Sequence, residues 1–224
     1  MEDKTTIFVV SAPSGTGKTT LNRRLVKEFP QIQFSISHTT RPIRPGERNG
    51  DHYHFVPDAE FSKLVASERM LEWAEVFGNK YGTTLDELSR IRSLGKNALL
   101  EIDVQGWQQA KRKLPEAVSI FILPPSVKHL WQRLEKRGTD SIEVRLKRIL
   151  TGRKEIQHGV EFQHVIINDD IEKAYGELKN VVIDRKQGSL SREQGLAHCA
   201  ALLTEFDRAD WLKELKKSCP NLNV

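Results

Sequence analysis

Residues 5–20 read TTIFVVSAPSGTGKTT, an apolar, β-branched run that passes into a turn of small residues and then into a lysine and two threonines. The apolar run, residues 5–11, predicts a buried β-strand. A helix is expected at 19–29, where Leu21 and Leu25 recur at helical spacing. The order of strand, turn and helix makes this segment decisive for the fold.

The turn matches the phosphate-binding motif G-x-x-x-x-G-K-[ST] at its last three positions, with Ala12 in place of the first glycine. Gly15 and Gly17 let backbone N–H groups turn inward around phosphate oxygens, and the helix directs its positive N-terminus at the same anion. Lys18 is expected to reach the β- and γ-phosphates, and the Thr19 hydroxyl to bind Mg²⁺. We expect Ala12 to adopt a backbone conformation that alanine reaches easily. The predicted triphosphate-binding residues are Ala12, Pro13, Ser14, Gly15, Thr16, Gly17, Lys18, Thr19 and Thr20.

Strands and helices alternate along most of the remaining chain, which is typical of a parallel sheet covered on both faces by helices. A polar stretch at about 37–84 interrupts this alternation and predicts an inserted subdomain. The tail at 189–217 predicts one or two amphipathic helices that dock on the body. Further strands are expected at 33–36, 97–102, 117–123 and 163–167, and helices at 105–113, 126–136, 137–159 and 171–185.

The composition narrows the class of protein. The 224 residues carry a net charge of +5, which suits a polyanionic small molecule, and lack the aromatic-interleaved basic run that would favour nucleic acid. No apolar run approaches the roughly 20 residues of a membrane span, and the N-terminus does not read as a signal peptide. Two cysteines, Cys199 and Cys219, form neither a disulfide framework nor a metal pattern. A cytoplasmic protein of one domain is expected, with no nucleic-acid or membrane partner.

The interrupting stretch contains SHTTRPIRPGERNGDHYHF at 37–55. Arg41 and Arg44 lie three residues apart in a loop rich in proline and glycine, where two guanidinium groups can grip a phosphate in a bidentate manner. Tyr53 and Tyr81 can add hydroxyl donors. The alternative is that both arginines are solvated loop charges.

This string resembles the guanylate kinases, P-loop kinases of nucleoside monophosphates, and the resemblance covers about residues 5–185. It implies an α/β fold with a P-loop NTPase-type parallel sheet flanked by helices, a small mixed α+β insertion for the monophosphate, and a helical lid. It also implies transfer of the γ-phosphoryl group of ATP to GMP with Mg²⁺, in purine nucleotide metabolism. We expect dGMP to be a second acceptor, because no residue of the pattern obviously reads the 2′-hydroxyl. Further matches are LEW (71–73), GNKYGT (78–83), DVQG (103–106), PPS (124–126), RGT (137–139) and NDD (168–170).

Guanine offers N–H donors at N1 and N2, so carboxylates accept from it and repel adenine; Glu72 and Asp103 match the family's positions. Ser37 and Thr83 would pair with the remaining base edge. Asp103 has a second possible role, holding hydrated Mg²⁺ through water, and Glu101 could share it. The residues that the resemblance assigns to GMP are Ser37, Arg41, Arg44, Glu47, Tyr53, Glu72, Tyr81, Thr83 and Asp103.

Residues 133–154 are rich in Lys and Arg, and phosphoryl transfer needs positive charge around the moving group. The resemblance points to Arg137 and Arg148 as lid arginines, which with Lys18 and Arg41 form the expected catalytic set. Asn168 matches a position near the adenine of ATP. Lid closure would exclude water, which otherwise competes as acceptor.

The predicted organisation is a core of residues 1–36, 85–136 and 159–186, a GMP-binding subdomain at 37–84, a lid at 137–158 and a helical extension at 187–224. The extension is either a packing element or a dimer contact, so both a monomer and a homodimer remain open. Two other functions remain as alternatives: a P-loop kinase acting on a ribosyl phosphate, and a noncatalytic scaffold module that binds protein ligands.

Overall fold

The computed structural model describes residues 5–76, 78–136, 138, 140–186 and 190–219. The chain divides into two compact units, the first comprising residues 1–9 and 26–118 and the second residues 10–25 and 119–224. The division passes through strand β1 (Ile7–Ser11) and helix α1 (Lys18–Glu28), so both elements contribute residues to each unit.

A five-stranded sheet has the strand order β2-β7-β1-β8-β9, with β1 at its centre. β1 is buried over its whole length, as its apolar sequence predicts. In the first unit β2 (Ile32–Phe34) and β7 (Asn97–Glu101) are parallel, and in the second unit β8 (Val118–Leu123) and β9 (His164–Ile167) are parallel. Neighbouring parallel strands that are distant in sequence require crossover connections, which confirms the predicted α/β fold.

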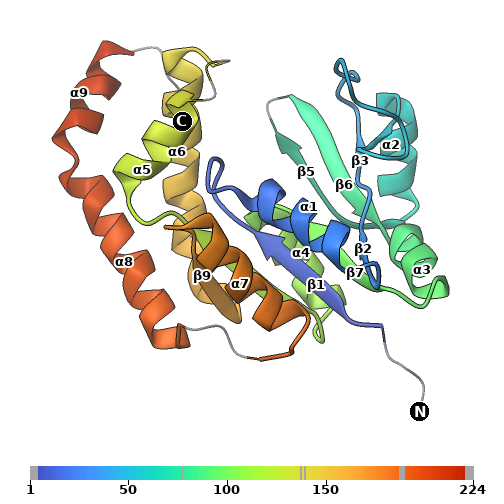
Figure 1. The fold of residues 1–224 in the computed structure, drawn as a ribbon. Helices are drawn as coiled ribbons and strands as arrows, with labels where there is room; N and C mark the ends of the chain where they lie inside the picture. Colours follow the sequence, from blue (N-terminus) through green and yellow to red (C-terminus); the bar gives the residue numbers. More distant parts are fainter. Residues whose placement is uncertain (1–4, 77, 137, 139, 187–189, 220–224) are drawn as a thin grey trace. The chain divides into compact units, whose positions relative to one another are not determined.

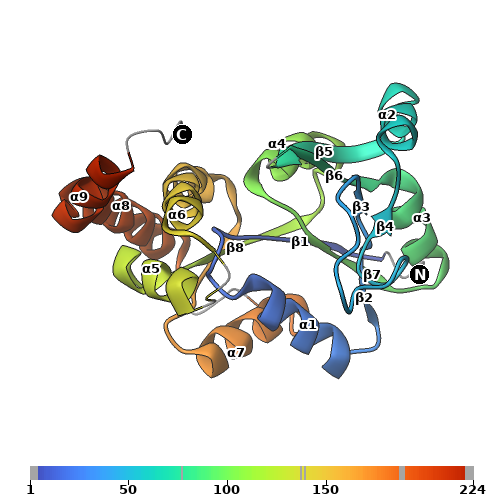
Figure 2. The same cartoon turned by 90° about the horizontal axis from the view of Figure 1, so that it is seen from above.

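The first unit also contains a four-stranded sheet of order β4-β3-β6-β5. Its strands β5 and β6 form an antiparallel hairpin, and the Phe61 ring of α2 packs edge-on against Trp73 with centroids 6.3 Å apart. Helix α4 lies against β5 (Figure 2). This sheet occupies the stretch in which an insertion is expected. The bounds are β3 (His38–Thr39), β4 (His54–Phe55), α2 (Asp58–Ala66), β5 (Met70–Val76), β6 (Asn79–Thr84), α3 (Leu85–Ser93) and α4 (Val104–Lys113).

In the second unit the tail forms two helices, α8 and α9, as the sequence predicts, and α8 lies along α6 (Figure 1). Leu202 and Phe206 of α8 are buried, and Gly195 permits close packing because a Cβ there would lie 2.6 Å from the Cβ of Val165. The bounds are α5 (Val127–Lys136), α6 (Ile142–Gln157), a 3₁₀ turn η1 (His158–Glu161), α7 (Ile171–Val182), α8 (Arg192–Arg208) and α9 (Asp210–Ser218).

The helix expected at 137–159 is wrong at its N-terminal boundary, because α6 begins at Ile142. Ser141 adopts an extended backbone and its hydroxyl accepts a hydrogen bond from the Val144 N–H, which is the geometry of a helix N-cap. The N-cap hydrogen bond of Ser141 therefore sets the start of α6, and the basic residues before Ser141 do not.

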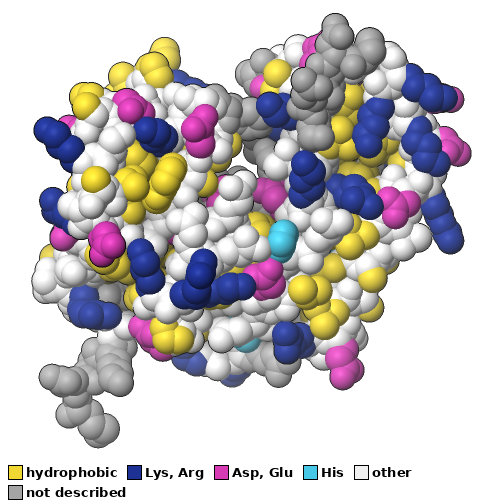
Figure 3. Space-filling view, turned by 180° about the vertical axis from the view of Figure 1, so that it is seen from behind, with side chains coloured by type: hydrophobic (Ala, Val, Ile, Leu, Met, Phe, Trp, Pro, Cys, Tyr) yellow, Lys and Arg dark blue, Asp and Glu magenta, His cyan; other side chains and the backbone are white. Residues whose placement is uncertain are grey.

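The described residues carry charged side chains of both signs on the surface. On the face shown in Figure 3, Lys and Arg side chains are interspersed with Asp and Glu. None of the helices in the described ranges has the length and apolar character needed to cross a membrane. Cys199 and Cys219 are free and buried. No group of three or more His, Cys, Asp or Glu side chains in the described part of the chain is arranged as a metal site.

Candidate nucleotide-binding sites

The turn between β1 and α1 has the backbone geometry of a phosphate-binding loop. Gly15 and Gly17 adopt φ values of +97° and +92°, in the left-handed region that side chains other than glycine rarely enter. Ala12 is buried and outside that region, since the only non-glycine residues with positive φ among those described are Glu68 and Arg185. The expectation that Ala12 replaces a glycine without strain is therefore confirmed.

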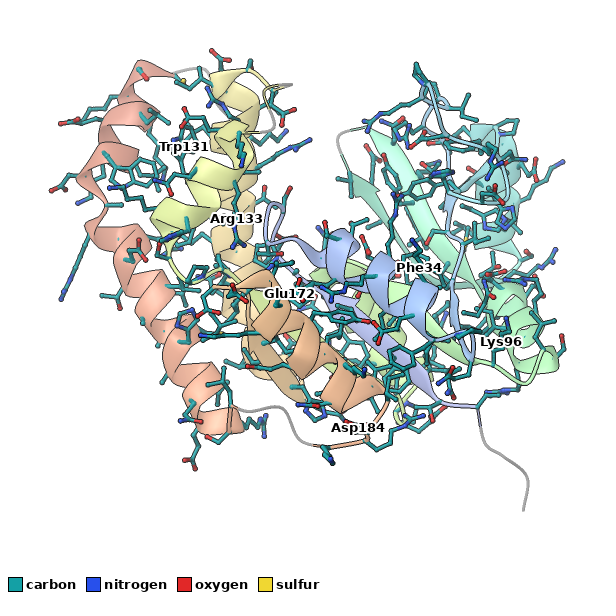
Figure 4. All side chains as sticks on the ribbon, in the orientation of Figure 1. Phe34, Lys96, Trp131, Arg133, Glu172 and Asp184 are labelled. Atoms are coloured by element: carbon teal, nitrogen blue, oxygen red, sulfur yellow. The ribbon has the colours of Figure 1, made fainter. Side chains whose placement is uncertain are left out.

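Two side chains from distant parts of the second unit donate hydrogen bonds to the same loop. The carbonyl oxygen of Thr16 accepts hydrogen bonds from Asn168 Nδ2 at 2.6 Å and from Arg133 Nη1 at 3.3 Å. Arg133 Nη2 also donates to the Asn168 carbonyl at 2.8 Å. Figure 4 labels Arg133, which projects from α5. Asn168 is only 2% exposed, and its Oδ1 has no hydrogen-bond partner among the described residues.

Arg133 joins the candidate site, although in the sequence it is only one of the many basic residues of 133–154. The sequence signal for it is its position four residues before the expected lid residue Arg137. Arg137 lies outside the described residues. Arg148, on α6, forms an ion pair with Asp140 at 3.0 Å and is about one-quarter exposed.

In the first unit, the carboxylate of Glu47 accepts hydrogen bonds from two residues of its own loop, Arg41 and Arg44. Arg41 donates to both carboxylate oxygens of Glu47, from Nη1 at 3.0 Å and from Nη2 at 2.9 Å. This hydrogen bonding is the main cause of a raised Arg41 pKa and a lowered Glu47 pKa. The Arg44 backbone N–H also donates to Glu47, at 2.8 Å, while the Arg44 residue is exposed.

Two aromatic side chains adjoin this ion pair. The Arg41 guanidinium lies 5.5 Å from the Tyr53 ring centroid, and the rings of Tyr53 and Tyr81 meet edge-on at 5.9 Å. Burial is the main cause of a raised Tyr53 pKa, and the neighbouring Glu101 carboxylate adds to it. The phenol therefore stays protonated and able to donate at neutral pH. The structure thus brings together four predicted residues, Arg41, Glu47, Tyr53 and Tyr81.

The other predicted residues of this unit form a second cluster. Glu72 is 5% exposed, and its Oε1 accepts from the Thr83 backbone N–H at 2.8 Å. Ser37 Oγ lies 3.2 Å from Thr83 Oγ1. Asp103 caps α4, because its Oδ1 accepts from the Gly106 N–H at 2.7 Å.

The lack of a side chain at Gly106 leaves space for the carboxylates of Glu72 and Asp103. A Cβ on Gly106 would lie 2.7 Å from Glu72 Oε2 and 3.3 Å from Asp103 Oδ1. The two carboxylates therefore approach the same point of α4, where a side chain would displace them. One carboxylate oxygen of each residue is committed to a backbone N–H, which orients the second oxygen.

Comparisons with known proteins identify the family of the chain. Residues 4–185 match the family model described as guanylate kinase. The chain is 50% identical over 200 residues to a guanylate kinase of Neisseria gonorrhoeae, covering 89% of this chain and 96% of the relative. It is 43% identical to a guanylate kinase of Salmonella typhimurium, covering 89% of this chain and 98% of the relative.

A solved structure is similar as well. The crystal structure of guanylate kinase from Anaplasma phagocytophilum superposes with a TM-score of 0.66 at 32% sequence identity, covering 83% of this chain and 88% of that one. Helices α8 and α9 lie beyond residue 185, where the match to the family model ends. On the family model, the relatives and the fold together, this chain belongs to the guanylate kinase family.

Proposed function

We propose that the protein transfers the γ-phosphoryl group of ATP to GMP, giving ADP and GDP. The observation that carries the proposal is the carboxylate cluster of Glu72 and Asp103 around Gly106, beside the hydroxyls of Ser37 and Thr83. A buried cluster of oriented acceptors suits a base with two adjacent N–H donors. The phosphate-binding loop of the second unit supplies the donor site for ATP.

Selection of guanine would follow from these acceptors. Guanine can donate from N1 and N2 to the carboxylates, whereas adenine places an acceptor at N1, whose lone pair would face the carboxylate oxygens with no hydrogen between them. Sites that hydrogen-bond their substrate reject analogues lacking the group by roughly 10⁴–10⁵-fold. We extend the proposal to dGMP, because recognition rests on the base and the phosphate.

The Arg41 cluster would bind the phosphate of GMP. The Arg41 guanidinium is already oriented by Glu47, and Tyr53 and Tyr81 lie beside it as hydroxyl donors. Pre-orientation lowers the entropic cost of binding, because the side chain is ordered before the ligand arrives. Arg44 is exposed and can turn toward the phosphate from the same loop.

Phosphoryl transfer would rely on positioning and positive charge. The attacking oxygen of GMP is already anionic, so no general base is required, and Lys18 and Arg41 would stabilise the charge that develops on the transferred group. Arg137 and Arg148 would join them when the lid closes. For this, Arg148 must exchange its ion pair with Asp140 for a phosphate.

Mg²⁺ is part of the proposal. The Thr19 hydroxyl is exposed in the first turn of α1, and oxygen ligands of this kind are those that Mg²⁺ prefers in kinase sites. Asp103 could contribute through water with the carboxylate oxygen that does not cap α4. The chemistry that Mg²⁺ would supply at these residues is positive charge, which would offset the negative charge of the ATP phosphates.

A coupled ADP-release assay tests the proposal, with ATP–Mg²⁺ and each of GMP, AMP, CMP and UMP as acceptor. Turnover with GMP alone is expected, and Lys18→Ala should abolish it. Glu72→Gln should raise the KM for GMP, because the amide replaces one acceptor by a donor that faces the guanine donors. Absence of turnover with every acceptor, despite nucleotide binding, would contradict the proposal and favour a binding module or a sugar-phosphate kinase.

A further inference from the structure

We propose that Arg133 and Asn168 are positioning residues that fix the Thr16–Gly17 peptide of the phosphate-binding loop before ATP arrives. The inference rests on the proposed function, because it assigns a role to residues beneath the ATP site. It differs from the role implied by the family resemblance, in which Asn168 lies near adenine.

The Thr16 carbonyl is the point on which both side chains converge. It accepts from Asn168 Nδ2 at 2.6 Å and from Arg133 Nη1 at 3.3 Å, and the second guanidinium nitrogen bonds the Asn168 carbonyl at 2.8 Å. Thr16 is completely buried, and its hydroxyl donates to the Pro13 carbonyl at 2.9 Å. The two donors come from α5 and from the residue after β9, so elements remote in sequence hold one peptide group.

The orientation of that peptide determines which group faces the phosphate. All peptide bonds in the described ranges are trans, so the Gly17 N–H points opposite to the Thr16 carbonyl. With the carbonyl held toward Arg133 and Asn168, the N–H faces the other way and is free to join the donors at the start of α1. Gly17 already accepts from Thr20 and Leu21 through its own carbonyl, which places it at the helix N-terminus.

The hydrogen bonds from Arg133 and Asn168 are needed because the loop contains two glycines, whose backbone is conformationally free. Gly15 and Gly17 adopt positive φ, and glycine populates positive and negative φ with similar ease. Rotation of the Thr16–Gly17 peptide would replace the inward N–H by a carbonyl oxygen, which repels phosphate. Packing opposes this rotation from the same side, since a Cβ on Gly17 would lie 2.7 Å from Asn168 Nδ2.

A guanidinium suits this position better than an ammonium group. Its planar array of N–H donors reaches two carbonyl oxygens at once, those of Thr16 and Asn168. Burial lowers the Arg133 pKa while the nearby Asp169 carboxylate raises it, and an arginine remains protonated under such shifts. The hydrogen bonds to both carbonyls are therefore charge-assisted.

The test compares Arg133→Met with Lys128→Met, which removes an equal charge from an exposed position on the same helix. Steady-state kinetics should show a KM for ATP raised about tenfold in the Arg133 variant, with the KM for GMP unchanged. Lys128→Met should match the unaltered protein. Arg133→Lys should recover only part of the loss, and it replaces Arg133→Met if that variant does not fold.

A second measurement separates bracing from direct contact with the nucleotide. Calorimetric titration with magnesium tripolyphosphate, which has no base or ribose, should show the same loss of affinity as titration with ATP. Loss for ATP alone would overturn the proposal, because it would mean that Arg133 contacts the nucleoside. Neither titration requires GMP phosphorylation, so a failure of the proposed function gives a different result.

A third measurement uses the protein without ligand. The ¹⁵N order parameter of the Gly17 amide should be lower in Arg133→Met and in Asn168→Leu than in the unaltered protein, because the peptide is no longer held. An unchanged order parameter at Gly17 would overturn the proposal even if ATP binding were weaker. Thermal unfolding of each variant identifies any effect that comes from global destabilisation.

Discussion

The guanidinium of Arg41 forms a bidentate ion pair with the carboxylate of Glu47, with donor–acceptor distances of 3.0 and 2.9 Å. The two side chains are 10% and 18% exposed, so the pair is shielded more than most loop ion pairs. Glu47, which the resemblance assigns to GMP binding, thus orients Arg41 within the described structure. The same carboxylate holds the Arg44 N–H and so shapes the whole loop.

Substitution of Glu47 by Gln should therefore weaken GMP binding without affecting ATP. The amide offers one acceptor instead of two, so Arg41 loses its fixed orientation. We expect the KM for GMP to rise about fivefold to tenfold, in the range that follows the loss of one charge-assisted hydrogen bond. Asp51→Asn is the matched control, since Asp51 pairs in the same loop with the exposed Arg48. Equal effects of both substitutions would contradict the role of Glu47.

A side chain at Gly106 should disturb the Glu72 carboxylate and so weaken GMP binding. Alanine at this position would bring a Cβ to 2.7 Å from Glu72 Oε2, so the carboxylate must move. Gly106→Ala should raise the KM for GMP and reduce the preference for GMP over AMP, while the KM for ATP stays constant. In α7, a Cβ added at Gly176 meets no described heavy atom within 4 Å, which makes Gly176→Ala the control. That control should stabilise the protein by up to about 1 kcal/mol in urea unfolding.

The C-terminal extension should contribute to the stability of the second unit. The Glu205 carboxylate of α8 accepts from the Val127 and Lys128 N–H groups at 3.0 and 3.2 Å, and so caps the first turn of α5. Glu205→Ala should lower the free energy of unfolding by about 1–2 kcal/mol, as the loss of a helix cap does. The exposed Glu214 of α9 provides the control, for which Glu214→Ala should change stability by less than about 0.5 kcal/mol. Equal urea midpoints for the two variants would show that the cap contributes nothing.

His38 should make the stability of the protein depend on pH. The pKa of His38 is lowered from 6.5 to about 4, mainly by burial and next by the neighbouring His54, whose ring centroid is 4.7 Å away. The nearby charged side chains act in both directions, because Glu87 and Asp86 raise this pKa and Arg69 lowers it. The unfolded chain therefore binds a proton between about pH 6.5 and 4 that the folded chain does not, and stability falls as pH falls through this window.

The expected size is modest because the ring is only about half-buried. After allowance for solvent screening, unfolding should cost about 1 kcal/mol less at pH 5 than at pH 7.5 through this one residue. Urea unfolding of His38→Gln at both pH values checks this, since the variant should lose that part of the pH dependence. A pH dependence equal to that of the unaltered protein would rule out His38 as its source.

Structural features that depend on residues close together in the chain can be predicted from the sequence. The strand, glycine turn and helix at the predicted phosphate-binding loop follow from local backbone preferences, and Gly15 and Gly17 adopt positive φ values that few other residues could adopt. The two tail helices follow from periodicity in the same way. The start of α6 was missed because a single hydroxyl, that of Ser141, determines it.

The sequence by itself determined the fold class, and it predicted the phosphate-binding loop and the residue types of the proposed GMP site, because each is encoded in a local pattern or a short motif. Only the tertiary structure decided which of those residues act on one another. Glu72 and Asp103 converge at Gly106, and Arg133 and Asn168 meet at Thr16, across separations of up to 152 residues. The physical reason is that such contacts depend on chain crossovers and side-chain packing, which no short window of sequence contains.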